Sequence, residues 1–264
     1  MNLVSTREPY GALLLHGLGS SMASVAVLAE RLVGDGIPSE APWLRGHGTR
    51  PEDLRGVTWH DWYADAVAAL DRLLARCDAA AVVGLSMGAL VALHVAIERP
   101  ERLRAVVVVA PALRQAHPFA GLVRFVAPFW RFLPAPTTCF NDPRCAHVAP
   151  GYDRLPASAV LALMAYARWL EPRLHRIHTP TLIVHSRADR VIRPASATRI
   201  YARLGAAEKE LQWFERSGHE MLLDCEGRAV LDAVERFILA HHPSRPAPAA
   251  SSAAPAPAPL TAEP

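Results

Sequence analysis

The sequence has no uninterrupted apolar run long enough to cross a membrane and no block of basic residues. A membrane-spanning helix needs about 20 consecutive apolar residues, and each run in this chain ends earlier. The first ten residues contain Arg7 and Glu8 and lack the apolar centre of a signal peptide, so we expect no targeting segment and a cytoplasmic location. Because the arginines are dispersed and the formal net charge is only +3, nucleic acid is not an expected partner.

Cysteine is scarce as well, and its spacing does not match the paired ligands of a metal site. We therefore expect no metal. Cys139 and Cys145 are close enough in the sequence to bridge a short loop, but a cytosolic setting favours free thiols. The four cysteines are Cys77, Cys139, Cys145 and Cys225.

The chain does contain enough apolar residues for one substantial core, since 51% of its 264 residues are hydrophobic. Short apolar runs alternate with amphipathic segments along most of its length. This alternation predicts an α/β fold with a mostly parallel, doubly wound sheet. Strands are expected near residues 12–15, 38–44, 79–83, 103–110, 181–186 and 210–214, and helices near 24–34, 59–76, 87–99, 194–204 and 226–241.

The alternation breaks between Pro111 and His178. Here an aromatic and proline-rich stretch precedes an apolar helix expected at 157–170, which indicates an insertion that forms a small helical cap or lid over the sheet. The predicted division is a core of residues 1–112 and 176–242, a cap of 113–175, and a disordered tail of 243–264, where Pro and Ala make up 15 of 22 residues.

Aromatic residues of the expected cap, Phe125 and Phe129 among them, are candidates for lining a substrate site. Apolar clusters at helical spacing usually indicate burial, so packing onto the core and lining of a substrate tunnel are favoured over membrane docking. Transient contact between the cap and a lipid surface stays open as an alternative.

Residues 84–88, Gly-Leu-Ser-Met-Gly, form a G-x-S-x-G pattern between an apolar run and a helical run. The pattern alone is weak, but a strand, a sharp turn and a helix form the setting in which such a serine becomes an exposed nucleophile. Glycines flank the serine because side chains there would collide with the neighbouring strand and helix. Ser86 is therefore the candidate nucleophile.

A serine hydroxyl needs a base, and the base needs a group that orients it. Asp189 follows the strand expected at 181–186, and His219 follows the one at 210–214, so both should lie at the carboxyl edge of the sheet with Ser86. Each alone could be structural, with Asp189 paired to a neighbouring arginine. Together they predict a triad in which His219 is the base and Asp189 orients it.

The remaining histidines are expected to be poorer bases. His16 precedes a glycine-rich loop, where an orienting hydrogen bond is the simpler role. The others considered lie in loops, helices or strands with no expected partner at a strand end: His47, His60, His94, His175 and His185.

Acyl transfer also requires two backbone N–H groups aimed at the developing oxyanion. Met87 follows the candidate nucleophile and begins the next helix, so its N–H is available. Leu18 lies in the glycine loop after the first strand and is expected to supply the second.

These motifs resemble the α/β-hydrolase family, and within it the bacterial carboxylesterases and monoacylglycerol lipases. The resemblance implies hydrolysis of carboxylic esters through an acyl-enzyme, with no metal or organic cofactor, and a cap in which Asp153 has the place of a polar glycerol contact. A solvent-facing role for Asp153 is the simpler reading. The resemblance covers the chain to about His242 and rests on residues 16–20, 45–49, 59–62, 84–88, 217–219 and 223–224.

The sequence departs from the usual family pattern at Leu18, where an aromatic residue is common, and in the bulky stretch 119–132. Both changes concern the lining of the pocket, so they affect the choice of substrate more than the reaction. Medium-chain acyl esters or monoacylglycerols are the expected substrates. The alternatives are a thioesterase or a carbon–carbon bond hydrolase with the same triad, or a non-catalytic ligand-binding protein of the same fold.

Overall fold

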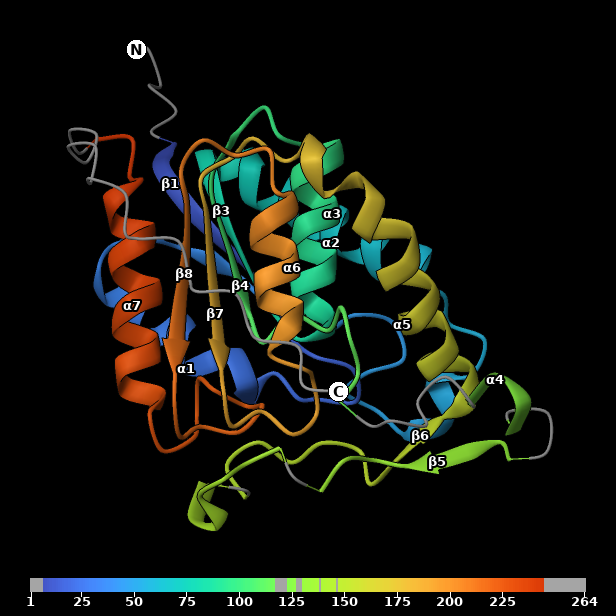
Figure 1. Cartoon of the computed structure of the whole chain (residues 1–264). Helices are drawn as coiled ribbons and strands as arrows, with labels where there is room; N and C mark the ends of the chain where they lie inside the picture. Colours follow the sequence, from blue (N-terminus) through green and yellow to red (C-terminus); the bar gives the residue numbers. More distant parts are fainter. Residues whose placement is uncertain (1–6, 117–122, 127–129, 138, 146, 245–264) are drawn as a thin grey trace.

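The computed structural model describes residues 7–116, 123–126, 130–137, 139–145 and 147–244. A six-stranded sheet lies at its centre, and every adjacent pair of its strands is parallel (Figure 1). In spatial order the strands are β2 (Ser39–Glu40), β1 (Glu8–Leu15), β3 (Cys77–Leu85), β4 (Leu103–Val109), β7 (Thr181–Ser186) and β8 (Lys209–Phe214).

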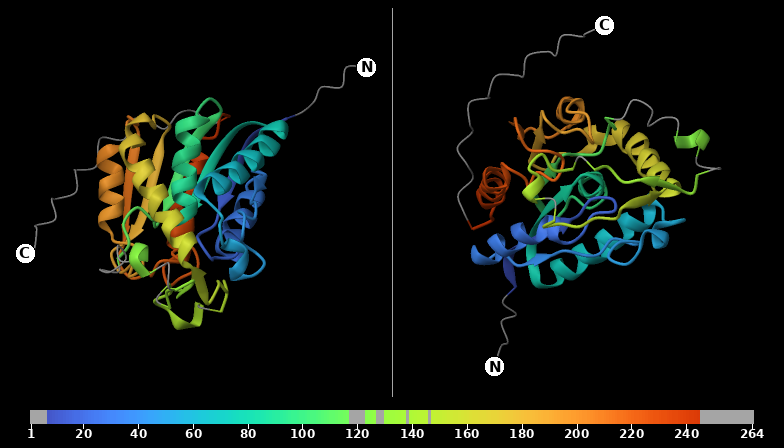
Figure 2. Two further views of the ribbon diagram at one scale, coloured as in Figure 1. Left: turned by 90° about the vertical axis from the view of Figure 1, so that its right-hand side faces the viewer. Right: turned by 90° about the horizontal axis from the view of Figure 1, so that it is seen from below.

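Helices cover both faces of this sheet (Figures 1 and 2). One face is covered by α1 (Ala23–Gly34) and α7 (Gly227–Ala240). The other is covered by α2 (Trp59–Arg76), α3 (Met87–Glu98) and α6 (Ala195–Arg203), with α5 (Ala157–Leu170) outside them. The expected doubly wound, mostly parallel α/β sheet is therefore confirmed.

Two hydrophobic clusters result, one on each face, because successive side chains of a strand point in opposite directions. In β4, Val106 and Val108 belong to the cluster under α2 and α3, whereas Val107 and Val109 belong to the cluster under α1 and α7. All four are fully buried. A continuous run of β-branched residues thus fits a strand that is covered on both sides.

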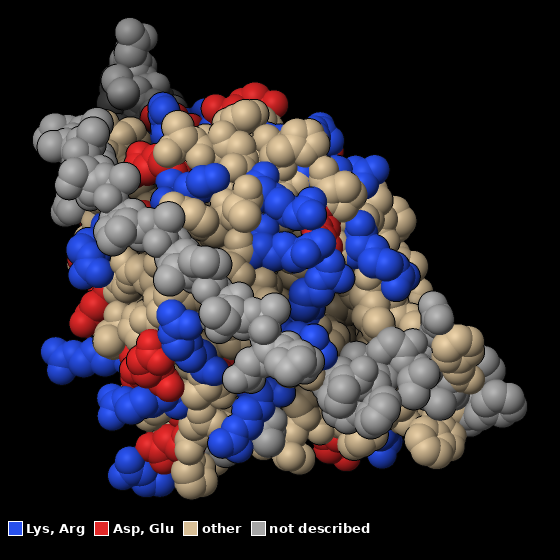
Figure 3. All heavy atoms as spheres, in the orientation of Figure 1, with Lys and Arg blue, Asp and Glu red and all other residues tan. Residues whose placement is uncertain are grey.

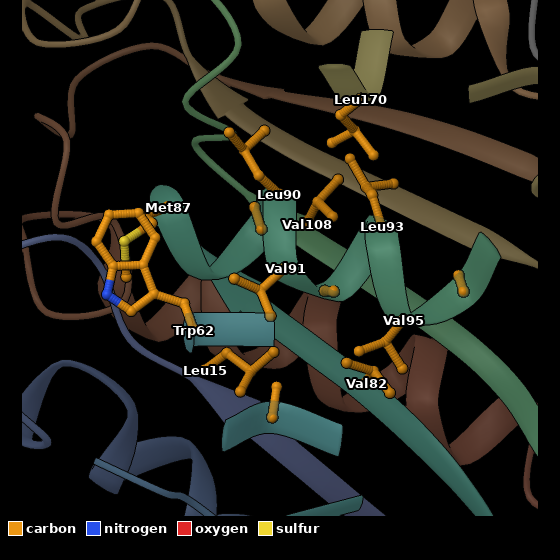
Figure 4. Packing of buried hydrophobic residues seen from close by; sticks show 14 of the residues in the cluster. Leu15, Trp62, Val82, Met87, Leu90, Val91, Leu93, Val95, Val108 and Leu170 are labelled. Carbon is orange, nitrogen blue, oxygen red and sulfur yellow. The ribbon is translucent and has the colours of Figure 1, made fainter. Parts of the chain in front are cut away.

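Helix α3 is the most deeply buried helix, with every residue from Met87 to Ile97 inside the protein. Figure 4 shows Leu90 and Leu93 of this helix close to Val108 of β4 and Leu170 of α5. A helix that is apolar on all sides needs such cover. The element that follows Ser86 is therefore held by contacts on all sides, which gives the serine a rigid support.

The strand expected at 38–44 is much shorter than predicted. Only Ser39 and Glu40 pair with β1, although the N–H of Ala12 also donates to the carbonyl oxygen of Pro38 (2.9 Å). Proline has no N–H, so Pro38 and Pro42 limit the ladder at both ends.

The chain leaves the sheet after β4 and returns at β7, which pairs with β4 directly. Between them, β5 (Phe132–Pro134) and β6 (Arg154–Pro156) form a small two-stranded antiparallel sheet that was not expected from the sequence. The helix expected at 157–170 is α5. Division of this region into core and cap stays a prediction.

The other short helices are η1 (Pro51–Leu54), α4 (Val123–Val126), η3 (Pro143–Cys145) and η4 (Glu171–Arg176).

Charged side chains of both signs are scattered over the face seen in Figure 3, and basic groups gather over α6. Glu171 lies beside three of them: Arg114 at 2.6 Å, Arg203 at 3.6 Å, and Arg199 in still closer contact. Part of the basic charge is thus paired locally. No helix in the described part of the chain is both long and apolar enough to span a membrane.

Candidate active site

Ser86 lies in the tight turn between β3 and α3, with φ 57° and ψ −112°. Its N–H donates to the carbonyl oxygen of Val109 (2.9 Å), which ties the turn to β4. A Cβ on Gly84 would lie 2.1 Å from the oxygen of Gly88, and one on Gly88 would lie 2.2 Å from the oxygen of Leu15. Both glycines are therefore required by close backbone contacts, and not only by turn geometry.

The three residues expected to form a triad are in contact. Ser86 Oγ lies 2.8 Å from His219 Nε2, and His219 Nδ1 lies 2.8 Å from Asp189 Oδ2. An ionised carboxylate only accepts hydrogen bonds, so the His219 Nδ1–H donates to Asp189 and Nε2 accepts from Ser86. All three side chains come from the carboxyl ends of strands and are buried.

Asp189 is held as an anion by its surroundings. Burial opposes its ionisation, but the charge of His219, the close approach of His185 and the hydrogen bond from His219 outweigh that cost and put the pKa of Asp189 well below its usual range. Its Oδ1 also accepts the N–H groups of Val191 (2.8 Å) and Ile192 (2.9 Å).

Asp189 in turn stabilises the charged form of His219. Burial works to lower the pKa of His219, but the charge and hydrogen bond of Asp189 and the charge of Glu220 outweigh it, so this pKa lies above its ordinary value of 6.5.

The glycine loop after β1 packs against the serine. A Cβ on Gly17 would lie 3.3 Å from Ser86 Cβ, so the next residue, Leu18, is close to the nucleophile. Met87 is the first residue of α3, where backbone N–H groups have no partner inside the helix. That the N–H groups of Leu18 and Met87 bind an oxyanion stays a prediction.

His16 fixes the shape of this glycine loop. Its Nδ1–H donates to the carbonyl oxygen of Gly17 (2.9 Å), and its Nε2 accepts the N–H of Leu44 (3.2 Å). Burial lowers the pKa of His16 to about 4, so the ring stays neutral and keeps both bonds near neutral pH. This is the orienting role expected for His16.

A supporting contact that sequence reasoning missed joins the segment between β4 and β7 to the His219 loop. Asp224 accepts the N–H groups of Asn141 (2.8 Å), Asp142 (2.9 Å) and Gly218 (2.5 Å). The Asn141 side chain also donates to the carbonyl oxygen of Arg216 (2.8 Å). Asp224 lies in a motif that carried the family resemblance, but no sequence signal pointed to Asn141.

His185 was expected to have no partner at a strand end, but the structure places it in contact with Asp189. His185 is the penultimate residue of β7, and its Nε2 lies 3.2 Å from Asp189 Oδ2. The chain turns after Ser186, so residues four apart meet across the end of the strand. The His-x-x-x-Asp spacing was visible in the sequence, but only the path of the turn makes it a contact.

The candidate substrate contacts are less defined. Asp153 is exposed immediately before β6, and Phe125 lies on α4 with 58% of its surface exposed. Phe129 lies outside the described residues.

The four cysteines, Cys139 and Cys145 included, are free thiols. Among the residues that the structure describes, no group of three or more His, Cys, Asp or Glu side chains could hold a metal ion.

A parallel sheet with helices on both faces, a serine on a strained turn after a central strand, and a histidine within hydrogen-bond distance define a serine hydrolase with an α/β-hydrolase fold. Comparison with known proteins agrees. The chain belongs to the family described as serine aminopeptidase, S33, which matches residues 11–226.

Relatives in this family include lipases and esterases. A thermostable monoacylglycerol lipase of Bacillus sp. (strain H-257) is 30% identical over 237 residues, which are 88% of this chain and 92% of that protein. A carboxylesterase of Bacillus subtilis (strain 168) is 25% identical over 86% of this chain and 91% of its own length. A structure solved for the metagenome-derived lipolytic enzymes LipS and LipT has a TM-score of 0.84 and 33% identity, covering 89% of this chain and 96% of that one.

Proposed function

We propose that the chain is a serine esterase that hydrolyses medium-chain carboxylic esters or monoacylglycerols through an acyl-enzyme. The observation that carries this proposal is the hydrogen-bonded series Ser86, His219, Asp189 on the turn between β3 and α3. In the proposed mechanism Ser86 is the nucleophile, His219 the general base and then general acid, and Asp189 the group that orients His219 and stabilises its charge.

Acylation begins when Ser86 Oγ attacks the carbonyl carbon of the ester while its proton passes to His219 Nε2. The tetrahedral intermediate then expels the alcohol, which takes that proton from His219. A water molecule, deprotonated by His219, attacks the acyl-enzyme, and the acid leaves as Ser86 recovers its proton. Every proton is thus carried by one imidazole nitrogen, and no other acid or base is needed.

The backbone N–H groups of Leu18 and Met87 stabilise the oxyanion of both tetrahedral intermediates. Loss of one such donor typically costs about 3 kcal/mol of transition-state stabilisation. Because both donors belong to the main chain, replacement of either side chain is expected to change their geometry and not to remove them.

The substrate class is proposed from the relatives and from the insertion. Bacterial relatives named as monoacylglycerol lipase and carboxylesterase cover most of the chain. Trp130 and Phe125 of the insertion are 64% and 58% exposed, which supports apolar contact with an acyl chain or transiently with a lipid surface. Burial of each additional CH₂ contributes about 0.8 kcal/mol until the pocket ends, which favours medium-length chains over acetate. Asp153 and Phe129 stay candidate contacts.

The test is hydrolysis of p-nitrophenyl esters from acetate to palmitate by wild type and by Ser86→Ala. We expect turnover by wild type with an optimum at medium chain length, and a fall of at least about 10³-fold in Ser86→Ala, since the nucleophile is lost. Turnover of 1-monoacylglycerols of the same chain length then tests the glycerol ester directly.

Two results would contradict the proposal. Equal activity of wild type and Ser86→Ala would exclude Ser86 as the nucleophile. A wild type that is inactive on all esters but cleaves acyl-CoA or a carbon–carbon bond of a diketone would keep the triad and change the reaction. Absence of turnover on all three classes would favour a ligand-binding protein.

A further inference from the structure

His185 is a buried histidine that the proposed mechanism does not use. It lies on β7, has no exposed surface, and its ring centroid is 6.1 Å from that of Trp213 on β8. Its Nε2 is 3.2 Å from Oδ2 of Asp189, the same oxygen that accepts the hydrogen bond of His219. The carboxylate of Asp189 is therefore in contact with two imidazole rings.

The acceptor positions of Asp189 show what this second ring can do. A carboxylate has about four lone-pair positions. Oδ1 accepts the N–H groups of Val191 and Ile192, and Oδ2 accepts the Nδ1–H of His219, so one position on Oδ2 is left. An ionised carboxylate donates nothing, so His185 can meet it favourably only with a proton on Nε2.

The two nitrogens of the His185 ring differ in what lies near them. Among the described residues, neither Nδ1 nor Nε2 of His185 has a partner with full hydrogen-bond geometry, but Nε2 lies 3.2 Å from Asp189 Oδ2. A neutral ring carries one proton, and a buried N–H without an acceptor costs more than a bare nitrogen without a donor. The proton is therefore better placed on Nε2, which has a carboxylate oxygen within 3.2 Å. The contact with Asp189 is longer than the 2.8 Å bond of His219, and catalytic hydrogen bonds often tighten only when substrate is bound.

We propose that His185 is a positioning residue that donates its Nε2–H to Asp189 Oδ2 and so fixes the carboxylate and moderates its pull on the proton of His219. The proposal rests on the proposed function of the triad. With His185 in place, Oδ2 is held toward His219 by donors on both oxygens. Without it, the carboxylate is freer to rotate and carries more charge on the oxygen that faces His219.

The proposal predicts a change in the pH dependence of the reaction. More charge on Oδ2 favours the protonated form of His219, so loss of the His185 donor shifts the acid limb of kcat/KM to higher pH. The ionisable groups that act on His219 are Asp189 and Glu220. Cys139 lies close enough to both carboxylates to feel their charge. All of these stay unchanged when His185 is replaced.

The experiment compares three variants at this position. His185→Phe keeps a ring and removes the donor, His185→Gln places an amide N–H near the position of Nε2, and His185→Asn carries the same amide on a side chain too short to reach Asp189. We expect His185→Phe and His185→Asn to raise the pKa of the acid limb by about 0.5 to 1 unit and to lower kcat at least about tenfold with little change in KM. His185→Gln should restore both.

His94→Phe is the matched control. His94 is a buried histidine of α3 whose Nδ1 lies 3.0 Å from the Tyr166 hydroxyl, and it does not contact the triad. We expect it to leave the pH profile unchanged. Thermal unfolding of all variants shows whether lost activity reflects a lost fold. If Phe, Gln and Asn variants share one pH profile with wild type, or if Gln restores neither kcat nor the acid limb, the proposal is overturned.

A second readout separates this proposal from the choice of substrate. A fluorophosphonate labels an activated serine without requiring a particular ester, and its rate of inactivation reports the same histidine pKa. If wild type is labelled at Ser86 but cleaves no ester, the proposed substrate class fails, and the His185 comparison still proceeds with the label. A labelling rate in His185→Phe with the wild-type pH dependence would contradict the role of His185.

Discussion

At the scale of single residues, the backbone of Ser86 is strained in a way that only its neighbours make possible. A non-glycine residue with positive φ costs on the order of 1–3 kcal/mol, and Ser86 has φ 57°. Gly84 and Gly88 allow the backbone segments around it to approach so closely that the turn has no alternative path. The strain keeps the hydroxyl directed at His219, and the buried helix α3 resists its release.

Gly84→Ala tests this arrangement. Its Cβ would meet the backbone oxygen of Gly88 at 2.1 Å, so the strand or the helix must shift. We expect the free energy of unfolding to fall by about 1–3 kcal/mol and esterase activity to fall further than stability explains, because Ser86 moves with the turn. Urea denaturation and p-nitrophenyl ester assays measure both.

Gly34→Ala is the control for this substitution. Gly34 ends α1, and nothing lies within 4 Å of the position of a new Cβ. Alanine there should leave activity unchanged and stabilise by about 0.5–1 kcal/mol. A Gly84→Ala variant as stable and active as Gly34→Ala would show that the close approach is not required.

At the scale of elements, the segment between β4 and β7 is attached to the His219 loop by backbone groups. Asp224 collects N–H groups from Asn141 and Asp142 on one side and from Gly218 on the other. The carbonyl oxygen of Cys139 accepts the N–H of Glu220 (2.9 Å), next to His219. The loop that carries the proposed base is therefore supported by the segment between β4 and β7 and not by the sheet alone.

Asp224→Asn should weaken this attachment. An amide has one oxygen and turns its NH₂ toward N–H groups that need an acceptor, so we expect a loss of about 1–3 kcal/mol in the free energy of unfolding, together with lower kcat. Asp232→Asn, which removes a half-exposed partner of Arg31, should cost less than about 1 kcal/mol. Urea denaturation distinguishes the two, and equal losses would mean that the Asp224 bonds are not special.

How far the elements could be predicted depended on their length. Long amphipathic or apolar segments have a clear period, and the helices expected at 59–76 and 157–170 have these bounds in the structure. The two-stranded sheet of β5 and β6 has three residues in each strand, too few for a period to be visible. In 38–44 the apolar character suggested a strand, but two prolines prevented most of the pairing.

At the scale of the whole molecule, buried ionisable groups make stability depend on pH. Burial raises the pKa of Glu220 above its ordinary value of 4.5, although hydrogen bonds from Ser24 and Ser20 and the charge of His219 oppose it. Below pH 4.5 both the folded and the unfolded chain hold this proton. As pH rises, the unfolded chain releases it first, so stability is lost until the pKa of the folded state is passed.

Glu220→Gln is expected to remove this loss. The difference in unfolding free energy between the variant and wild type should shift in favour of the variant as pH rises above 4.5. Glu52→Gln is the control with opposite sign, because hydrogen bonding to Arg154 lowers the pKa of this exposed carboxyl. Urea denaturation over a pH series measures both. Parallel curves for Glu220→Gln and wild type would contradict the assignment of a raised pKa.

The three residues of the candidate triad were easier to predict from the sequence than the residues that contact and hold them. Ser86, Asp189 and His219 each follow a strand, and a parallel sheet brings such positions to one edge, so their meeting could be inferred from chain order. Asn141 and Asp224 meet because a loop of the segment between β4 and β7 folds back on the sheet, which no local pattern encodes. The contact of His185 with Asp189 was missed because it depends on the path of the turn after β7, which the sequence does not show.

The direct pairing of β4 with β7, which places Val106 opposite Thr181, has a consequence for how such enzymes diversify. The segment between these strands starts and ends on a fixed register, and lengthening a loop with fixed ends costs little additional entropy. The segment between β4 and β7 can therefore be replaced by one of another length while the sheet and the proposed triad keep their positions. The attachment at residues 139–142 sets one condition for a graft: a replacement must still offer backbone N–H groups to Asp224.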